Sequence, residues 1–382
     1  MTFIPILSQL QEKLDKRLQE GNLRSLKSQT NLVDFCSNDY LGLARNKEFQ
    51  EIVLMKMAAL PQPHLGATGS RLISGTHPYM LETEEFLAQM WEAEAALVFN
   101  SGYQLNTALL ATIPQKGDTI LSDQLIHASL REGARLSLAQ RYYFKHNDLA
   151  DLEAKMRRST GNIFVVAESV YSMDGDQAPI AEIIALCKKY NAYLIVDEAH
   201  STGIYGKYGE GWLYENNWHQ EVFARIYTFG KAIGGHGACI VGSKILISYL
   251  INFARAFIYT TALPLHTWVH IREAFGYIYQ NNDLQKKLEQ NIQDFRQMLG
   301  GLPNLKESTT PIQIIQIGGN ERTKKFAQIL QNSGFDVRAV LSPTVQAGEE
   351  IVRICLHSFN TSEQIQELCG IITETIQQFS EK

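Results

Sequence analysis

The sequence predicts an α/β protein whose largest domain contains a mostly parallel sheet flanked by helices. From about residue 80 onward, short apolar runs alternate with helical patterns, which is typical of repeated strand–helix units. Two of the runs, 163–166 and 193–196, are apolar on both faces. A strand that helices cover on both faces needs this composition, so the two runs predict the centre of a parallel sheet.

The expected strands all end in polar side chains or turns. They are the runs 97–100, 119–123, 141–144, 162–169, 192–200, 225–231 and 238–243. Because ligands bind at the carboxyl ends of parallel strands, we expect the polar residues there to meet at one rim of the sheet. These residues are Ser122, Asp123, Glu168, Ser169, Asp197, Glu198 and Lys231.

The two ends of the chain have different patterns. Residues 1 to about 20 are expected to form an amphipathic helix, and a short strand and a turn are expected within 31–45. Long helices are expected over 245–300, followed by alternating segments and two helical patterns. We therefore predict three parts: an N-terminal helix and arm over 1–45, a large α/β domain over 46–285, and a small α+β domain over 286–382.

Composition excludes several classes of function. Of the 382 residues 20% are charged and the formal net charge is -5, so no basic excess indicates nucleic-acid binding. The N-terminus has no signal-peptide pattern, and we expect neither a membrane span nor secretion. The five cysteines form no CxxC pair, which argues against a disulfide framework or a zinc site and for a reducing, cytoplasmic compartment. No spacing of potential ligands predicts a metal site.

Lys231 is the first candidate for chemistry. It ends the run 225–231 and precedes a glycine-rich stretch, 234–237. A lysine amine that lies over a cofactor can form an imine with an aldehyde, and Thr228 can bind a phosphate near that imine. The alternative is a surface lysine before a loop.

Asp197 and His200 follow the apolar run 193–196. A carboxylate beside a pyridine nitrogen favours the protonated ring, which is the form that withdraws electrons. Asp197 suits this role, and His200 can hydrogen-bond a ring oxygen. A helix cap is the alternative for Asp197. The interval to Lys231 leaves room for one helix and one strand, so the two side chains are expected to face each other.

Two further segments suit a flat, phosphorylated ligand. Residues 100–103 (NSGY) lie between a predicted strand and a helical pattern, where backbone N–H groups and a glycine make a phosphate site. An ordinary helix N-cap is the alternative. His127, just beyond the run 119–123, can stack its imidazole on a ring, although a structural histidine is the simpler interpretation.

In their order and spacing, these and other segments resemble the α-oxoamine synthases, which are fold-type-I pyridoxal-phosphate enzymes. The resemblance extends from about Asn38 to Arg353. The segments are NDYLGL (38–43), GSRLISG (69–75), SGY (101–103), HAS (127–129), ESVYSMDGD (168–176), DEAH (197–200), TFGK (228–231) and YTTALP (259–264).

The resemblance implies a fold-type-I architecture, pyridoxal 5'-phosphate held as a Schiff base on Lys231, and a homodimer with shared sites. The implied catalytic residues are Lys231, His127, Asp197 and His200. The implied cofactor-binding residues also include Ser101, Gly102, Tyr103, Ser172 and Thr228, together with Thr260 and Thr261, which would reach the phosphate of the neighbouring subunit. The implied substrate-binding residues are Arg24, Asn38 and Arg353, of which Arg353, expected to end a strand, would grip the amino-acid carboxylate.

The reaction that the resemblance implies is a decarboxylative condensation of an amino acid with an acyl thioester. Segments 172–176 and 253–261 favour the branch that joins L-alanine to a pimeloyl thioester in biotin biosynthesis. Other branches use glycine with acetyl-CoA or succinyl-CoA, or serine with a long acyl-CoA. An aminotransferase would share Lys231 and Asp197, but segments 127–129 and 172–176 argue against it. A non-enzymatic binding protein has no reason to carry this combination.

Two residues depart from the pattern of the family. Ser201 stands where glycine is usual, and His236 stands where small residues are more usual. Both are expected to lie close to the implied site.

Overall fold

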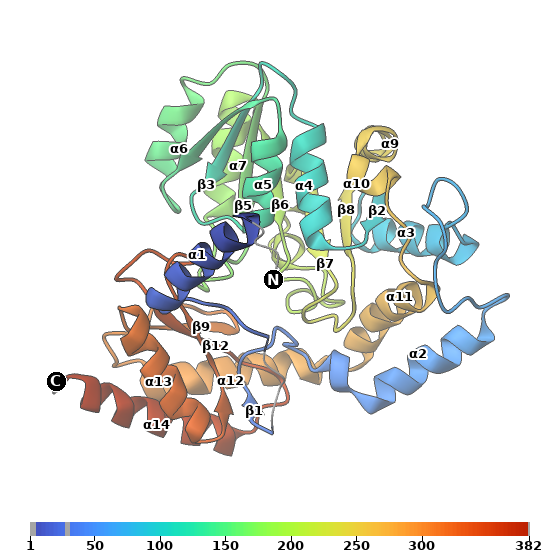
Figure 1. The fold of residues 1–382 in the computed structure, drawn as a ribbon. Coiled ribbons are helices and arrows are strands. Elements are labelled where there is room, and N and C mark those ends of the chain that lie inside the picture. Colours follow the sequence, from blue (N-terminus) through green and yellow to red (C-terminus); the bar gives the residue numbers. More distant parts are fainter. Residues whose placement is uncertain (1–4, 27–30, 381–382) are drawn as a thin grey trace. The chain divides into compact units, whose positions relative to one another are not determined.

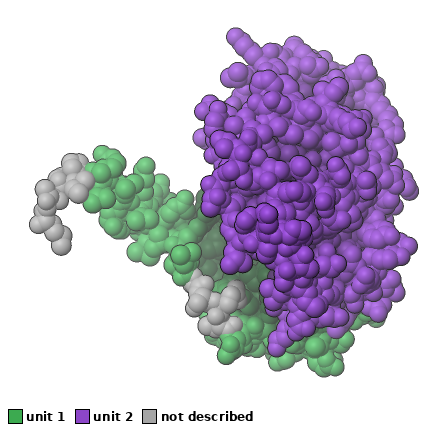
Figure 2. All heavy atoms as spheres, turned by 90° about the vertical axis from the view of Figure 1, so that its right-hand side faces the viewer, with its two compact units in different colours: residues 1–37, 173–175, 289–382 green, residues 38–172, 176–288 purple. Residues whose placement is uncertain are grey.

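The computed structural model describes residues 5–26 and 31–380. The chain divides into two compact units, which Figure 2 distinguishes by colour. Unit 1 contains residues 1–37, 173–175 and 289–382, and unit 2 contains residues 38–172 and 176–288. The domain limits at 45 and 285 stay a prediction. Among the helices of the described residues, none is both long and apolar enough to cross a membrane.

Unit 2 contains a seven-stranded sheet in the order β2-β8-β7-β6-β5-β3-β4. Its strands are β2 (Ala95–Phe99), β3 (Thr119–Asp123), β4 (Gln140–Phe144), β5 (Ile163–Glu168), β6 (Tyr193–Asp197), β7 (Ala224–Thr228) and β8 (Ala238–Gly242). Strands β4, β3, β5, β6 and β7 pair in parallel, and β8 pairs antiparallel with both β7 and β2. The predicted mostly parallel sheet is confirmed.

Burial along the strands explains why their apolar runs can be recognised in the sequence. Strands β3, β5 and β7 are buried at every residue, as strands covered on both faces must be. The edge strand β4 is exposed at its first four residues, so it depends less on apolar composition. In β6 the first residue, Tyr193, is 40% exposed because it stands at the entrance of the strand.

Helices flank this sheet, among them α4 (Gly102–Thr112), α6 (Leu149–Met156) and α7 (Ile180–Tyr190), whereas α2 (Lys47–Ala59) packs on α11 (Leu265–Gln280) (Figure 1). The other helices of unit 2 are α3 (Pro78–Met90), α5 (Ala128–Leu136), α8 (Trp212–Glu215), α9 (Lys244–Phe253) and α10 (Arg255–Ile258), with short 3-10 turns at Leu43–Arg45 and His219–Glu221. Helix α12 (Asp283–Leu299) continues into unit 1. The helices expected over 245–300 are therefore present, but extended residues Ala254 and Pro264 interrupt them.

Unit 1 has the predicted α+β character. Strands β11 (Arg338–Val340), β12 (Ile351–Cys355) and β9 (Ile312–Gln316) form an antiparallel sheet, and β1 (Val33–Asp34) pairs in parallel with β10 (Phe335–Asp336). Its helices include α1 (Pro5–Gln19), α13 (Asn320–Asn332) and α14 (Ser362–Ser380). Residues 1–4 of the predicted N-terminal helix lie outside the described residues.

Two residues lie elsewhere in their elements than predicted. Strand β7 ends at Thr228, and Lys231 stands in the following loop. This loop returns the chain into antiparallel β8, and hydrogen bonds from the Phe229 N–H to the Gly237 carbonyl (3.0 Å) and from the Gly235 N–H to the Phe229 carbonyl (2.7 Å) close it. Arg353 does not end its strand but lies in the middle of β12, because pairing with β9 continues to Cys355.

Candidate active site

A cavity of about 250 Å³ lies within unit 2, beyond the carboxyl ends of its parallel strands. Nine of the predicted catalytic, cofactor-binding and substrate-binding residues line it: Asn38, Ser101, Gly102, Tyr103, His127, Asp197, His200, Thr228 and Lys231. His236, one of the two departures from the family pattern, also lines the cavity. The fold thus brings together residues from five separate segments of the chain.

Asp197 is a buried carboxylate in this cavity, with 4% of its surface exposed. One carboxylate oxygen, Oδ1, accepts a hydrogen bond from the Ala199 N–H at 2.9 Å. The other, Oδ2, accepts from Asn106 Nδ2 of helix α4 at 2.8 Å. Two donors from different elements therefore hold the carboxylate in one orientation. Asn106 was not singled out, because the sequence does not show which face of α4 looks into the cavity.

His127 caps the N-terminus of helix α5 with its own side chain. Its Nδ1 accepts a hydrogen bond from the Ser129 N–H at 3.2 Å, and the Ser129 hydroxyl lies 2.7 Å from the same atom. Burial lowers the pKa of His127, and Lys231 lowers it further against the opposing effect of Asp197. The imidazole is therefore neutral near pH 7, which suits a ring that stacks on another flat ring.

Glu168 is a second carboxyl group in the cavity, and its role was not predicted. It ends β5 in register with Asp197 on β6, and it accepts a hydrogen bond from the His127 N–H. Burial and the Asp197 carboxylate raise the pKa of Glu168 to about 8, against the lowering effect of that hydrogen bond. Glu168 is therefore mostly protonated at neutral pH.

Tyr40, which lies 160 positions earlier in the chain, orients His200. The Tyr40 hydroxyl lies 2.8 Å from Nδ1 of His200 and donates to Oδ1 of Asn38 at 3.1 Å. Tyr40 is fully buried. It belongs to the NDYLGL segment, but only the tertiary structure reveals this contact.

Helix α4 begins at the cavity, where the sequence predicts an anion site. Ser101 is its N-cap, and the Ser101 hydroxyl accepts a hydrogen bond from the Gln104 N–H at 3.3 Å. A Cβ atom added at Gly102 would lie 2.8 Å from Cγ2 of Thr228, so glycine permits the close approach of the helix start to β7. Backbone N–H groups and the Ser101 and Thr228 hydroxyls thus converge where a phosphate can bind.

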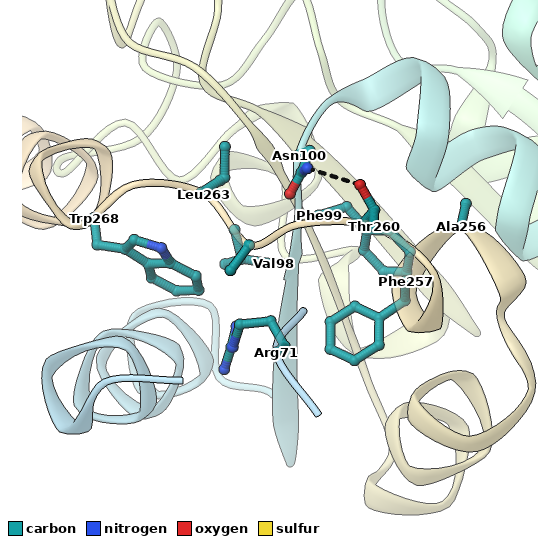
Figure 3. A pocket seen from close by; sticks show the side chains of 10 residues that line it. Arg71, Val98, Phe99, Asn100, Ala256, Phe257, Thr260, Leu263 and Trp268 are labelled. Carbon is teal, nitrogen blue, oxygen red and sulfur yellow. Dashed lines mark hydrogen bonds between the residues drawn. The ribbon is translucent and has the colours of Figure 1, made fainter. Parts of the chain in front are cut away.

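The other predicted cofactor residues of unit 2 do not line this cavity. Thr260 lines a separate, smaller cavity beside Arg71 and Trp268 (Figure 3). Asn100 Nδ2 donates to the Thr260 hydroxyl at 3.2 Å and to the Thr261 carbonyl at 2.8 Å. These bonds tie the YTTALP segment to the strand end that precedes Ser101. Ser172 is buried, with 8% of its surface exposed, and is not among the lining residues.

The two predicted substrate arginines belong to unit 1. Arg24 is exposed, and its Nη2 donates to the Thr344 hydroxyl at 3.3 Å. Arg353 is half-buried, and its Nη1 donates to Cys355 Sγ at 2.9 Å. Their roles toward the substrate stay predictions.

Ser201 does not line the cavity but is hydrogen-bonded to a buried carboxyl group. Its hydroxyl donates to Oε1 of Glu198 at 2.8 Å and lies 2.9 Å from the Ser169 hydroxyl. Glu198 is fully buried, and burial raises its pKa to about 7 although the Ser201 hydrogen bond lowers it. The hydroxyl at position 201 is therefore part of a buried hydrogen-bond network.

Ser201→Ala is expected to destabilise the fold by about 1–3 kcal/mol, because Glu198 loses a donor that no water can easily replace. Urea unfolding of the purified protein measures this difference. Ser333→Ala is the matched control, since the Ser333 hydroxyl is exposed and donates to the Ile329 carbonyl, and it should stay within about 0.5 kcal/mol. Equal stability of the two variants would contradict the structural role of Ser201.

Comparisons with known proteins agree on the family. A family model described as aminotransferase class I and II matches residues 30–372. The chain is 38% identical over 374 residues to 8-amino-7-oxononanoate synthase of Emericella nidulans, which covers 92% of this chain and 90% of that protein. It is 37% identical over 354 residues to 8-amino-7-oxononanoate synthase of Marinobacter nauticus, which covers 92% of this chain and 89% of that protein.

Two solved structures show the same fold. The crystal structure of 8-amino-7-oxononanoate synthase from Francisella tularensis matches with a TM-score of 0.78 and 28% identity, and it covers 91% of this chain and 98% of that chain. Serine palmitoyltransferase from S. paucimobilis matches with a TM-score of 0.88 and 24% identity, and it covers all of both chains. The second likeness, at this identity, concerns the fold alone.

Proposed function

Because this chain belongs to the aminotransferase class I and II family and, within it, to the family of 8-amino-7-oxononanoate synthases, we propose that it condenses L-alanine with a pimeloyl thioester. The products are 8-amino-7-oxononanoate, the free thiol and CO2, as a step of biotin biosynthesis. One observation carries the proposal: Lys231, Asp197, His127 and His200 line a single cavity together with the N-terminus of α4.

The residues present fit pyridoxal phosphate as the cofactor. The glycine at 102, where a Cβ atom would meet Thr228, leaves the helix start open to a phosphate. Asp197 is a buried carboxylate that suits a protonated ring nitrogen, and Lys231 offers an amine to the aldehyde. Each chemical group of the cofactor thus has a counterpart in the cavity.

When bound, the cofactor supplies an electron sink for negative charge that develops on the amino acid's Cα. Asp197 keeps the proton on the ring nitrogen, since its own charge is held by Asn106 and the Ala199 N–H. Lys231 takes the Cα proton as general base and returns a proton at the end of the reaction. A bond forms between Cα and the acyl carbon as the C–S bond of the thioester breaks, and the released thiolate takes a proton from solvent. The carboxylate of alanine then leaves as CO2.

The two histidines have different tasks in this proposal. The neutral imidazole of His127 covers one face of the ring and excludes water from it. His200 meets the Tyr40 hydroxyl at Nδ1, so we assign the contact with the ring oxygen to its Nε2. Arg353 binds the carboxylate of the amino acid, and Asn38 assists it. Ser172, Tyr103 and Arg24 keep the roles that the family resemblance implies.

We extend the proposal to a cytoplasmic homodimer in which Thr260 and Thr261 reach the phosphate in the neighbouring subunit. The hydrogen bonds from Asn100 that hold both threonines in place support this role, because they fix the segment at a strand end. The mass of the purified protein in solution, measured by light scattering, tests the dimer.

The substrate assignment predicts release of CoA only with a matched pair of substrates. The purified protein is loaded with pyridoxal phosphate and given L-alanine with pimeloyl-CoA, glycine with acetyl-CoA, or serine with palmitoyl-CoA. We expect CoA release and an 8-amino-7-oxononanoate mass with the first pair. Turnover of either other pair would keep the family and overturn the substrate. Formation of pyruvate from alanine without CoA release would indicate an aminotransferase instead.

A further inference from the structure

We propose that His146 is a positioning residue, which clasps the turn before the cavity residue His127 to the loop after the cavity residue Glu168 by bridging Asp123 and Asp176. The inference rests on the proposed function. The two segments are the turn 123–127, which carries His127, and the loop 170–177, which carries Ser172. His146 does not line the cavity, so it would act through these segments and not on the substrate.

Both ring nitrogens of His146 meet a carboxylate. Nδ1 lies 2.9 Å from Oδ1 of Asp123, and Nε2 lies 2.7 Å from Oδ2 of Asp176. A carboxylate can only accept a hydrogen bond, so an imidazole placed between two of them carries a proton on each nitrogen. Burial alone would lower the pKa of His146, but the hydrogen bonds to Asp123 and Asp176 raise it to about 10. The imidazole of His146 is therefore cationic at neutral pH.

Asp123 shapes the turn that presents His127. It is fully buried at the end of β3, and its Oδ1 also accepts a hydrogen bond from the Leu125 N–H at 2.7 Å. Its Oδ2 accepts from the Asn147 N–H at 2.9 Å. Helix α5 begins directly after this turn, with His127 as its N-cap. A change in the charge or position of Asp123 is thereby passed to the ring of His127.

Asp176 closes the loop that carries Ser172. Its carbonyl accepts a hydrogen bond from the Tyr171 N–H at 2.9 Å, and Val170 and Gln177 form an antiparallel bridge beside it. Asn147 Nδ2 donates to the same Oδ2 that His146 contacts, at 2.9 Å. The chain leaves unit 2 after Ser172 and re-enters it at Asp176. The contacts of His146 and Asn147 with Asp176 therefore fix the residue at which the chain re-enters unit 2.

The location of the clasp argues for positioning and against stabilisation alone. A buried ion pair is a weak source of stability, because desolvation of the charges offsets most of their attraction. This one joins the turn after β3, which leads to the cavity residue His127, to the loop after β5, which follows the cavity residue Glu168. The other groups that face His146 are Tyr171, whose ring packs edge-on at 4.5 Å, and the amide of Asn147. Neither supplies a countercharge to the two aspartates at neutral pH.

The test compares His146→Gln, Asp176→Asn and the double variant. In His146→Gln two carboxylates face a neutral amide, so the segments are pushed apart, and kcat/KM for the condensation should fall about 10- to 100-fold while the cofactor absorption band remains. In the double variant the introduced glutamine amide can donate to Asp123 and accept from the introduced asparagine amide, so most of the loss should be recovered. His219→Gln is the matched control, because buried His219 meets a single carboxylate, Glu92, at 3.2 Å.

The pH dependence of kcat/KM distinguishes a charged His146 that positions the two segments from a side chain that only fills space. A histidine whose pKa is raised by the fold contributes fully below its ordinary value of about 6.5, and its contribution disappears as the pH rises through about 10. The ratio of wild-type to His146→Gln activity should therefore be large at and below neutral pH and fall as the pH rises through about 10. A side chain that only fills space would give a constant ratio.

The outcomes of the test are distinct. If His146→Gln is as active as His219→Gln, or if the double variant is worse than either single variant at every pH, the inference is wrong. If His146→Gln does not fold, Asp176→Asn, which keeps the His146–Asp123 contact, must still lower kcat/KM several-fold for the inference to stand. If the wild-type protein itself shows no cofactor band and no turnover, the proposed function fails, independently of the clasp.

Discussion

Lys231→Ala is expected to remove the visible absorption band of lysine-bound pyridoxal phosphate and to lower kcat by at least about 10³-fold. Two losses combine in this variant, since the amine is both the attachment point of the cofactor and the proposed general base. General base catalysis alone contributes about 10²- to 10⁴-fold. The cavity should still bind the free cofactor through its phosphate, because Ser101, Gly102 and Thr228 are untouched.

Absorption spectra and steady-state turnover of the purified variant measure this effect. Lys188→Ala is the matched control, because Lys188 lies on the surface of α7 in an ion pair with Glu221 at 2.8 Å. The control should keep both the band and the turnover. An unaltered band in Lys231→Ala would place the cofactor on another lysine and would remove the basis of the proposed mechanism.

Asp197→Asn is expected to lower kcat by about 10- to 10³-fold without emptying the cavity of cofactor. An opposite charge within a few ångströms shifts a pKa by about 1–3 units, and this shift is what keeps the ring nitrogen protonated. Asparagine preserves the size of the side chain and can still accept the hydrogen bond from the Ala199 N–H. Its amide nitrogen replaces the oxygen that accepts from Asn106 Nδ2, so the loss reports the charge together with this one hydrogen bond.

The same measurement needs a control for the removal of a buried aspartate charge. Asp118 serves this purpose, because it is 7% exposed and accepts hydrogen bonds from the N–H groups of Gln115 and Asn162, away from the cavity. Asp118→Asn should lower stability but leave kcat of the folded protein unchanged. Equal kcat for Asp197→Asn and the wild-type protein would show that the ring nitrogen does not depend on this carboxylate.

Much of the fold follows from local composition. Strand β3 begins and ends where its run was predicted, and the other predicted strands differ from the observed bounds by a few residues at most. The reason is that strands covered on both faces must be apolar throughout, which leaves a pattern that can be read without the structure. The segments that point to a lysine-bound cofactor could likewise be read directly, since each depends on residue type and chain order.

The three-dimensional contacts of the site could not be read in this way. The roles of Glu168 and Asn106 depend on the register of β5 with β6 and on the face that α4 turns to the cavity. Tyr40 meets His200, and His146 meets Asp123 and Asp176, across long intervals of sequence. Ser201, which departs from the family pattern, does not line the cavity, and only the structure shows that its hydroxyl donates to buried Glu198.

The sequence by itself thus determined the α/β class of this protein, the mostly parallel sheet and the identity of the residues with chemical potential, because hydrophobic pattern and residue type are local properties. Only the tertiary structure decided that Lys231 stands in the loop after β7, that Arg353 lies within β12, and which side chains share the cavity with Asp197. Strand register and helix orientation decide these contacts, and both result from packing between segments that are far apart in the chain.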